Sequence, residues 1–243
     1  MSFPPPRAVT SAEETVGSLV APEGGPAVRG SYDTVAESYA ELVGQGMEAE
    51  ALWERAVLGV VAASVSAGAV VGDLGCGTGR VAGYLRGLGV SVVGVDLSPG
   101  MLRVAARDHA HVAFAAGDMT RLPLATGVLG GALAWYSTVH SSDEQVDAMA
   151  AEFARVLAPG GVLCVAFKVG PDGSAPASWL LHAYGRPVRL PVYRRPVDEL
   201  CAILGRHGLT ETARVVRQPE DREATPQGFV LFRRAARVAG SAS

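Results

Sequence analysis

The sequence contains no asparagine, a single lysine and only three cysteines among its 243 residues. The cysteines lie far apart and form no C-x-x-C pair, so neither a disulfide framework nor a zinc site is indicated, and we expect no metal. No run of Lys or Arg exceeds two residues and the formal net charge is -3, which disfavours nucleic acid as a partner because phosphate binding usually leaves a basic footprint. No segment approaches the ~18 uninterrupted apolar residues that a membrane span needs.

The length predicts one large domain rather than two. Residues 1–30 are rich in proline and glycine and hold no apolar stretch long enough for a signal peptide. We therefore expect a flexible leader over 1–30, a single domain over 31–243, and a cytoplasmic protein.

Strands and helices alternate along the middle of the chain. Strands are predicted at 70–74, 91–95, 112–115, 128–135 and 162–169, with helices at 81–88, 101–107 and 142–158 between them. Two helices precede this region, at 32–43 and 47–64, and a helix at 197–207 follows with two last strands at 212–217 and 229–233. The alternation predicts an α/β fold with a Rossmann-like, doubly wound, mostly parallel seven-stranded sheet whose last strand is antiparallel.

The most informative stretch is VVGDLGCGTGR, which begins at Val70. An apolar run meets the acidic residue Asp73 and then three glycines at alternate positions, which predicts a buried strand ending in a backbone that bends sharply beside a ligand. Arg80 stands where the dinucleotide fingerprint would place its last glycine, so a nicotinamide cofactor is disfavoured. The three glycines are Gly75, Gly77 and Gly79.

This stretch resembles the first motif of class I S-adenosylmethionine-dependent methyltransferases, an acidic residue followed by x-G-x-G-x-G. The resemblance implies that S-adenosyl-L-methionine (AdoMet) is the cofactor and that a small-molecule acceptor receives its methyl group. It also implies that the turn, including Cys76, lies against the methionine part of AdoMet and that Asp73 anchors the ammonium group. A carboxylate suits a ligand with a sulfonium, an ammonium and no phosphate.

Acidic residues also close the next two strands. Asp96 ends the second strand, where a carboxylate can accept both ribose hydroxyls and where the family places its ribose-binding acid; a simple turn cap is the alternative. Asp118 and Met119, after the third strand, look like the family's adenine contact. Leu97 and Met101 would supply apolar faces for the adenine ring, or would equally be core residues.

The segment after the fourth strand should flank the switch point in strand order, beside the transferable methyl group. Trp135 and Tyr136 offer aromatic faces there, which favour a sulfonium through cation–π attraction. His140 has an unperturbed pKa of roughly 6.5, which suits a general base acting on a phenol or hydroxyl. The alternative is a histidine that caps the next helix or bonds to backbone.

Tyr32 and Tyr39 belong to a Y-D-x-x-A-x-x-Y pattern that resembles the helix preceding the core in small-molecule members of the family. In those proteins such tyrosines close over the cofactor. Helical spacing alone would equally produce a buried aromatic stripe.

Residues 170–196 hold five prolines, several aromatics and no clear period, so they are expected to leave the sheet edge as an irregular insertion that covers the substrate. An aromatic, mildly charged cover suggests a small, partly apolar acceptor such as a natural-product intermediate. Aromatics that simply pack on the sheet are the alternative. The candidate substrate-binding residues are Trp179, His182, Tyr184 and Tyr193.

Three functional classes compete at this point. A small-molecule methyltransferase is favoured, while an RNA- or protein-directed methyltransferase of the same fold is disfavoured by the absent basic patch. The third class is a non-catalytic AdoMet-binding module, or a dehydrogenase. The lack of asparagine also excludes the Asp/Asp/Asn metal site of catechol-type enzymes as it is usually built.

Overall fold

A seven-stranded sheet with strand order β4-β3-β2-β5-β6-β10-β9 forms the centre of the protein. The computed structural model describes residues 13–14, 24–44, 46–47, 52–170, 178–220 and 223–236. The first five strands in that order are mutually parallel, and β10 runs antiparallel to both of its neighbours. The predicted doubly wound sheet with an antiparallel last strand is therefore confirmed. The strands are β2 (Val70–Leu74), β3 (Ser91–Asp96), β4 (Ala113–Ala116), β5 (Leu129–Trp135), β6 (Leu157–Lys168), β9 (Leu209–Arg217) and β10 (Gln227–Arg234).

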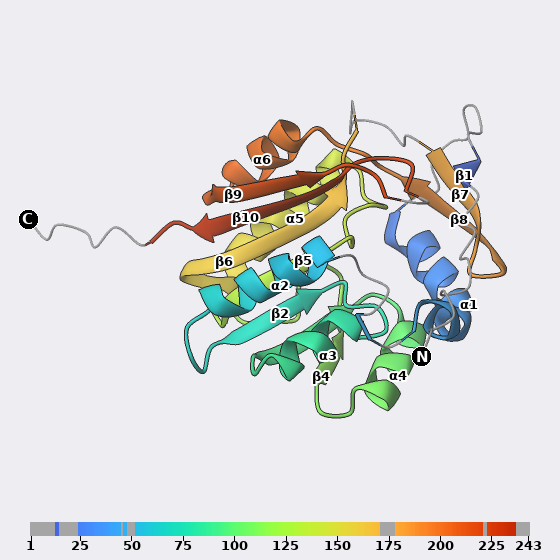
Figure 1. The fold of residues 1–243 in the computed structure, drawn as a ribbon, viewed down its shortest axis with the longest axis horizontal. Helices are drawn as coiled ribbons and strands as arrows, with labels where there is room; N and C mark the ends of the chain where they lie inside the picture. The colour runs from blue at the N-terminus through green and yellow to red at the C-terminus, as the bar shows by residue number, and fades with distance from the viewer. Residues whose placement is uncertain are drawn as a thin grey trace, which may run out of the picture.

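Helices cover both faces of this sheet (Figure 1). Side chains of α2 and α3 pack on one face, and those of α5 and α6 pack on the other. Within the described part of the chain, no helix combines the length and apolar character that crossing a membrane requires. The helices are α1 (Gly24–Val43), α2 (Leu52–Ser64), α3 (Arg80–Gly87), α4 (Pro99–Asp108), α5 (Asp143–Val156) and α6 (Val197–Gly205).

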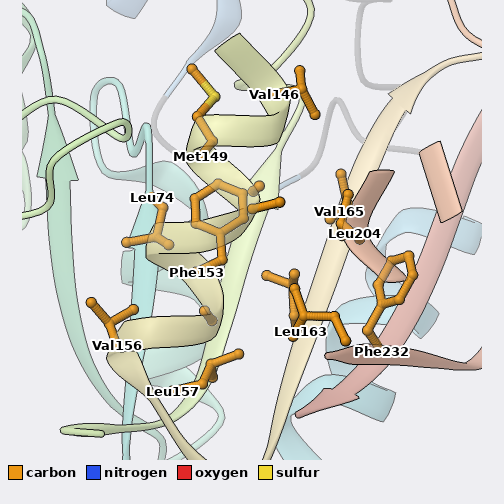
Figure 2. Packing of buried hydrophobic residues seen from close by; sticks show 14 of the residues in the cluster. Leu74, Val146, Met149, Phe153, Val156, Leu157, Leu163, Val165, Leu204 and Phe232 are labelled. Carbon is orange, nitrogen blue, oxygen red and sulfur yellow. The ribbon is translucent and has the colours of Figure 1, made fainter. Parts of the chain in front are cut away.

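Helix α5 holds the centre of the sheet in place. Ser142 and Gln145 form a capping box that satisfies backbone N–H groups at its first turn. The helix then presents Phe153 to the sheet, in the same apolar cluster as Leu163 and Val165 of β6 (Figure 2). Burial of one such side chain stabilises the fold by about 1.5–3 kcal/mol. The carboxyl ends of β5 and β6 are thereby held on a rigid support.

Strand β6 begins five residues earlier than the predicted strand at 162. The Pro159-Gly160-Gly161 segment, which predicted a break, continues the strand, and its pairing with β5 shifts register between Leu129 and Gly131. Such an irregularity absorbs Pro and Gly residues without ending the ladder.

An antiparallel hairpin replaces the irregular insertion expected over 170–196, so that expectation is wrong for the described residues 178–192. Its strands are β7 (Ser178–Ala183) and β8 (Arg186–Val192), and β7 also pairs with the short strand β1 (Glu13–Glu14). The prolines of this segment predicted irregular structure, but Pro187 and Pro191 lie on β8. This strand is at an edge of the three-stranded sheet, where a missing N–H is tolerated. Residues 171–177 lie outside the described part.

Helix α1 begins at Gly24, before the boundary expected at residue 31. Pro26 falls in its first turn, a position that tolerates the missing proline N–H. Residues 1–12 and 15–23 of the expected leader lie outside the described residues. Figure 1 shows α1 beside β8, away from the main sheet, and these two elements make many contacts.

Candidate functional site

A cavity of about 550 Å³ lies at the carboxyl ends of the central strands. Its walls come from α1, from the loops after β2 to β5, from the end of β6 and from the β7–β8 hairpin. Three aspartates mark one part of it, called the acidic end: Asp73, Asp96 and Asp118. Six further lining residues are grouped here by their mixed chemistry as the mixed end: Val139, His140, Gln145, Met149, Lys168 and Val192.

The glycine turn lines the cavity with Gly75, Cys76 and Gly77. The backbone N–H groups of Gly75 and Cys76 both donate to the carbonyl of Val95, at 2.7 and 3.0 Å. Gly75 has a φ of 78°, and a Cβ there would lie closer than 3.0 Å to Ser137 in the loop after β5. Only glycine therefore lets the loops after β2 and β5 meet, as the switch-point expectation requires.

The other two glycines of the motif differ from each other. A Cβ on Gly77 would meet no atom within 4 Å, so this backbone borders open space. Gly79 does not line the cavity: it precedes α3 with a φ of 80°, and a Cβ there would lie 2.8 Å from Phe114. Its role is close packing rather than contact with a ligand.

Asp96 connects the strand end to the glycine turn. One carboxylate oxygen accepts from the N–H of Gly77 at 2.7 Å and the other from the N–H of Ser98 at 2.8 Å. Burial raises the pKa of Asp96, and these two N–H groups oppose the increase. Each oxygen keeps a lone pair for a further donor, such as one hydroxyl of a vicinal diol.

Of the three aspartates of the acidic end, Asp73 makes the fewest hydrogen bonds. The residue is 1% exposed, and neither of its carboxylate oxygens makes a hydrogen bond. Burial and the charge of Asp96 raise the pKa of Asp73 to about 7. The backbone N–H of Ala82, which is nearby but outside hydrogen-bond geometry, and the charge of Arg80 lower it. Because an unpaired buried carboxylate is costly, a cation at this end of the cavity would stabilise it.

The remaining residues of the expected cofactor site lie together around the acidic end. Asp118 accepts from the N–H and the hydroxyl of Thr120, at 2.8 and 2.7 Å, which orders the turn after β4. Met119 and Leu97 line the cavity beside it. Met101 also lines the cavity but is 1% exposed and packs against α1, so it serves the core as well.

Helix α1 is fastened to the acidic end by Asp33, which the sequence reasoning missed although it stands inside the Y-D-x-x-A-x-x-Y pattern. Its carboxylate accepts from the Ser98 hydroxyl at 2.6 Å and from the Gly100 N–H at 2.8 Å. Tyr32 and Tyr39 line the cavity from this helix.

Two tyrosines adopt backbone conformations that L-residues rarely use. Within the described ranges, Tyr136 and Tyr184 are the two non-glycine residues with positive φ, at 53° and 52°. Both line the cavity, and Tyr184 packs edge-on against Tyr39 with ring centroids 4.6 Å apart. Tyr184 and Gly185 both have positive φ at the hairpin turn, where Asn-Gly is the usual pair. Trp135, also a cavity residue, packs against Phe229 with a centroid distance of 5.4 Å.

His140 is held between two elements. Its Nδ1 lies 2.6 Å from the carbonyl oxygen of Pro191 on β8, and its Nε2 lies 2.9 Å from the hydroxyl of Tyr32 on α1. Because a carbonyl can only accept, Nδ1 carries the hydrogen and Nε2 accepts from Tyr32. Burial and, less strongly, the charge of Lys168 lower the pKa of His140 to about 4, although the Pro191 carbonyl opposes the decrease.

Only one of the four candidate substrate residues lines the cavity, namely Tyr184. Trp179 is 4% exposed and lies under the Arg189 guanidinium, and Tyr193 lies under that of Arg195. His182 is exposed on β7. Instead, the sequence reasoning missed the cavity residues Arg80, Ser141, Gln145, Met149, Lys168 and Leu180. Lys168 ends β6, so the strand-end rule could have found it.

No group of three or more His, Cys, Asp or Glu side chains among the described residues is arranged to hold a metal ion. The donors and charges that converge on the cavity suit an organic cation with hydroxyl groups instead.

Comparisons with known proteins identify similarity over the segment that contains the glycine turn. A family model described as a methyltransferase domain matches residues 71–161. A demethylmenaquinone methyltransferase from Beutenbergia cavernae is 37% identical over 142 residues, which is 57% of this chain and 57% of that protein. The chain therefore aligns with little more than half the length of this curated relative.

Solved structures resemble most of the fold. A 1,6-didemethyltoxoflavin-N1-methyltransferase from Burkholderia thailandensis, with bound 1,6-didemethyltoxoflavin and S-adenosylhomocysteine, has a TM-score of 0.69 and 20% identity, covering 95% of this chain and 99% of that one. A [4+2]-cyclase, SpnF, has a TM-score of 0.66 and 18% identity, covering 86% and 96%. The same fold thus occurs in proteins named for different reactions.

Proposed function

We propose that this protein is a class I AdoMet-dependent methyltransferase that transfers a methyl group from AdoMet to a small-molecule acceptor, and the methyltransferase-domain match over residues 71–161 and the similarity to a demethylmenaquinone methyltransferase support this. The observation that carries the proposal is the buried carboxylate of Asp73, which has no hydrogen-bond partner at the foot of the glycine turn. A ligand with an ammonium group and a sulfonium supplies the positive charge that this end of the cavity requires.

The acidic end holds AdoMet in this proposal. Asp73 faces the ammonium group, the backbone from Gly75 to Gly77 lies along the methionine part, and the free lone pairs of Asp96 accept from the ribose hydroxyls. Asp118 and the Met119 N–H contact adenine. The other residues assigned to the cofactor are Tyr39, Cys76, Leu97, Met101, Trp135 and Tyr136.

AdoMet supplies, when bound, a methyl group that a nucleophile displaces in line. The chain's own residues position the nucleophile and exclude water, which are the contributions such a displacement requires. Tyr39 from α1 and Tyr184 from the hairpin contact each other at the cavity, where their rings would exclude water from the bound cofactor.

The mixed end takes the acceptor. Met149 and Val192 form apolar walls there, while Gln145 and Lys168 supply a hydrogen-bonding amide and a positive charge. This combination fits a small, partly apolar molecule with a polar or anionic substituent. The names of the curated relative and of the toxoflavin neighbour, which both refer to small molecules, support the same class. The formal net charge of -3 supports an acceptor other than nucleic acid and we expect the reaction in the cytoplasm.

Isothermal titration calorimetry tests the proposal most directly. We expect micromolar binding of AdoMet and of S-adenosylhomocysteine (AdoHcy), and no measurable binding of NAD. Binding of NAD without AdoHcy would overturn the proposal. AdoHcy binding without release of AdoHcy from AdoMet, over a broad panel of acceptors, would instead favour the non-catalytic module.

A further inference from the structure

We propose that Tyr32 and His140 form a proton relay at the boundary between the two ends of the cavity, with the Tyr32 hydroxyl facing the acceptor and His140 behind it. The proposal rests on the proposed function and deepens it, because it commits the acceptor to a hydroxyl that must lose its proton. Tyr32 is thereby reassigned from the cofactor to the acceptor.

The hydrogen-bond directions define the relay. Pro191 offers only a carbonyl to Nδ1 of His140, at 2.6 Å, so the hydrogen of the neutral ring stays on Nδ1. The lone pair of Nε2 is then aimed at the Tyr32 hydroxyl, 2.9 Å away. A histidine acting directly on the acceptor would need Nε2 free, whereas here the Tyr32 oxygen stands in front of it.

The position of Tyr32 agrees with this role. The residue lines the cavity together with His140, and α1 is fixed at this point because its neighbour Asp33 is bonded to Ser98 and Gly100. Asp96, on the acidic side, and Tyr39 add to burial in raising the pKa of the Tyr32 hydroxyl. The hydroxyl therefore remains protonated and is a donor to Nε2, with its oxygen lone pairs available to an acceptor O–H.

The proposed step moves two protons and one methyl group. The acceptor O–H bond breaks as a new O–H bond forms on Tyr32, while the former Tyr32 proton forms an N–H bond at Nε2 of His140. The acceptor oxygen uses its electron pair to bond the methyl carbon, and the sulfur keeps the pair of the broken S–C bond. One positive charge is lost from sulfur and one appears on the imidazolium, so the net charge of the closed site is unchanged. The imidazolium later releases its proton to water.

The surrounding charges explain why the relay is ready at neutral pH. Lys168 from β6 is the cation that acts on His140, whereas Asp96, Tyr39 and Tyr184 lie on the Tyr32 side. The lowered pKa of His140 keeps the ring neutral, and it also makes the ring a weaker base while the sulfonium is present. Loss of the sulfonium charge during transfer removes one repulsion against the imidazolium.

The first experiment needs no acceptor. Nitrogen-15 NMR of histidine-labelled protein with bound AdoHcy should show His140 as the uncommon tautomer, with a pyrrole-type Nδ1 and a pyridine-type Nε2, and His140→Gln assigns both signals. Tyr32→Phe should move the Nε2 signal and leave Nδ1 in place, whereas Tyr84→Phe, on α3 and outside the cavity lining, should move neither. A hydrogen on Nε2 in the wild type, or an Nε2 signal indifferent to Tyr32→Phe, overturns the relay. Absence of AdoHcy binding would instead overturn the proposed function.

The second experiment separates proton transfer from a structural tie between α1 and the hairpin. AdoHcy formation is followed at pH 8.5 with 4-nitrophenol, which is ionised, and with 4-methylphenol, which is protonated. We expect Tyr32→Phe and His140→Gln to lower kcat for 4-methylphenol by about 10²-fold with little change in KM, and to lower kcat for 4-nitrophenol by less than about tenfold. Equal losses for the two phenols would assign the pair a structural role.

Discussion

Cofactor binding should release a proton from Asp73. Its pKa of about 7 in the free protein reflects burial without a hydrogen-bond partner, and an ammonium group placed beside it should return that pKa towards its ordinary range near 3.8. At pH 6 roughly 0.9 of the Asp73 carboxyls are protonated before binding, so about 0.9 proton should leave per AdoHcy bound. The apparent affinity should be about tenfold weaker at pH 6 than at pH 8, because the lost proton opposes binding as the pH falls.

Calorimetry at pH 6 in two buffers of different ionisation enthalpy measures this release. Asp73→Asn should abolish it and remove most of the pH dependence of the affinity. Asp118→Asn is the matched control, since it changes another aspartate of the cavity, and proton release should persist in it. Release below about 0.2 proton in the wild type would refute the assignment of Asp73 to the ammonium group. Undiminished release in Asp73→Asn would transfer the titration to Asp96, the other buried carboxylate.

Three further predictions use separate parts of the structure. Asp96→Ala should weaken AdoHcy binding by about 30-fold or more, because hydrogen bonds to a charged group contribute about 1.5–3 kcal/mol. Asp147→Ala, on α5 and bonded to Arg206 and His207 outside the cavity lining, should leave calorimetric affinity unchanged. Equal affinities for both variants would contradict the ribose assignment. Gly75→Ala should lower the free energy of unfolding by about 2 kcal/mol or more because of the clash with Ser137, and Gly77→Ala by only about 1 kcal/mol. Both variants should weaken AdoHcy binding. Equal losses of stability in urea denaturation would argue against the contact between the loops after β2 and β5. The imidazole of His140 binds a proton below about pH 6.5 in the unfolded state but only near pH 4 in the folded state. The free energy of unfolding should therefore fall as the pH drops from 6.5 to 4, by up to about 3 kcal/mol more than in His140→Gln. Parallel curves of unfolding free energy against pH for the two proteins would refute the lowered pKa.

The sequence located the acidic end because each of its parts is local. Asp73 and Asp96 end apolar runs, and the carboxyl ends of parallel strands meet at one edge, so proximity followed from topology alone. Lys168 obeys the same rule at the end of β6 and was missed because the rule was applied only to the first four strands.

Other features depend on contacts between distant segments. The bond between Tyr32 and His140 joins residues 108 positions apart, and neither residue's local pattern contains it. The hairpin was missed because its turn uses Tyr184 before Gly185 in place of Asn-Gly, and because prolines occupy its edge strand. Trp179 and Tyr193 were expected in the cavity on aromatic character alone, which does not distinguish a ligand contact from packing under an arginine.

The two tyrosines with positive φ also bear on whether this cavity has an occupant at all. Each backbone conformation costs a non-glycine residue on the order of 1 kcal/mol, a cost that glycine would avoid by a single substitution. Tyr136, in the loop after β5, and Tyr184, in the hairpin turn, both line the same cavity. Both costs occur at the cavity, as expected if the two tyrosine side chains contact a bound molecule there.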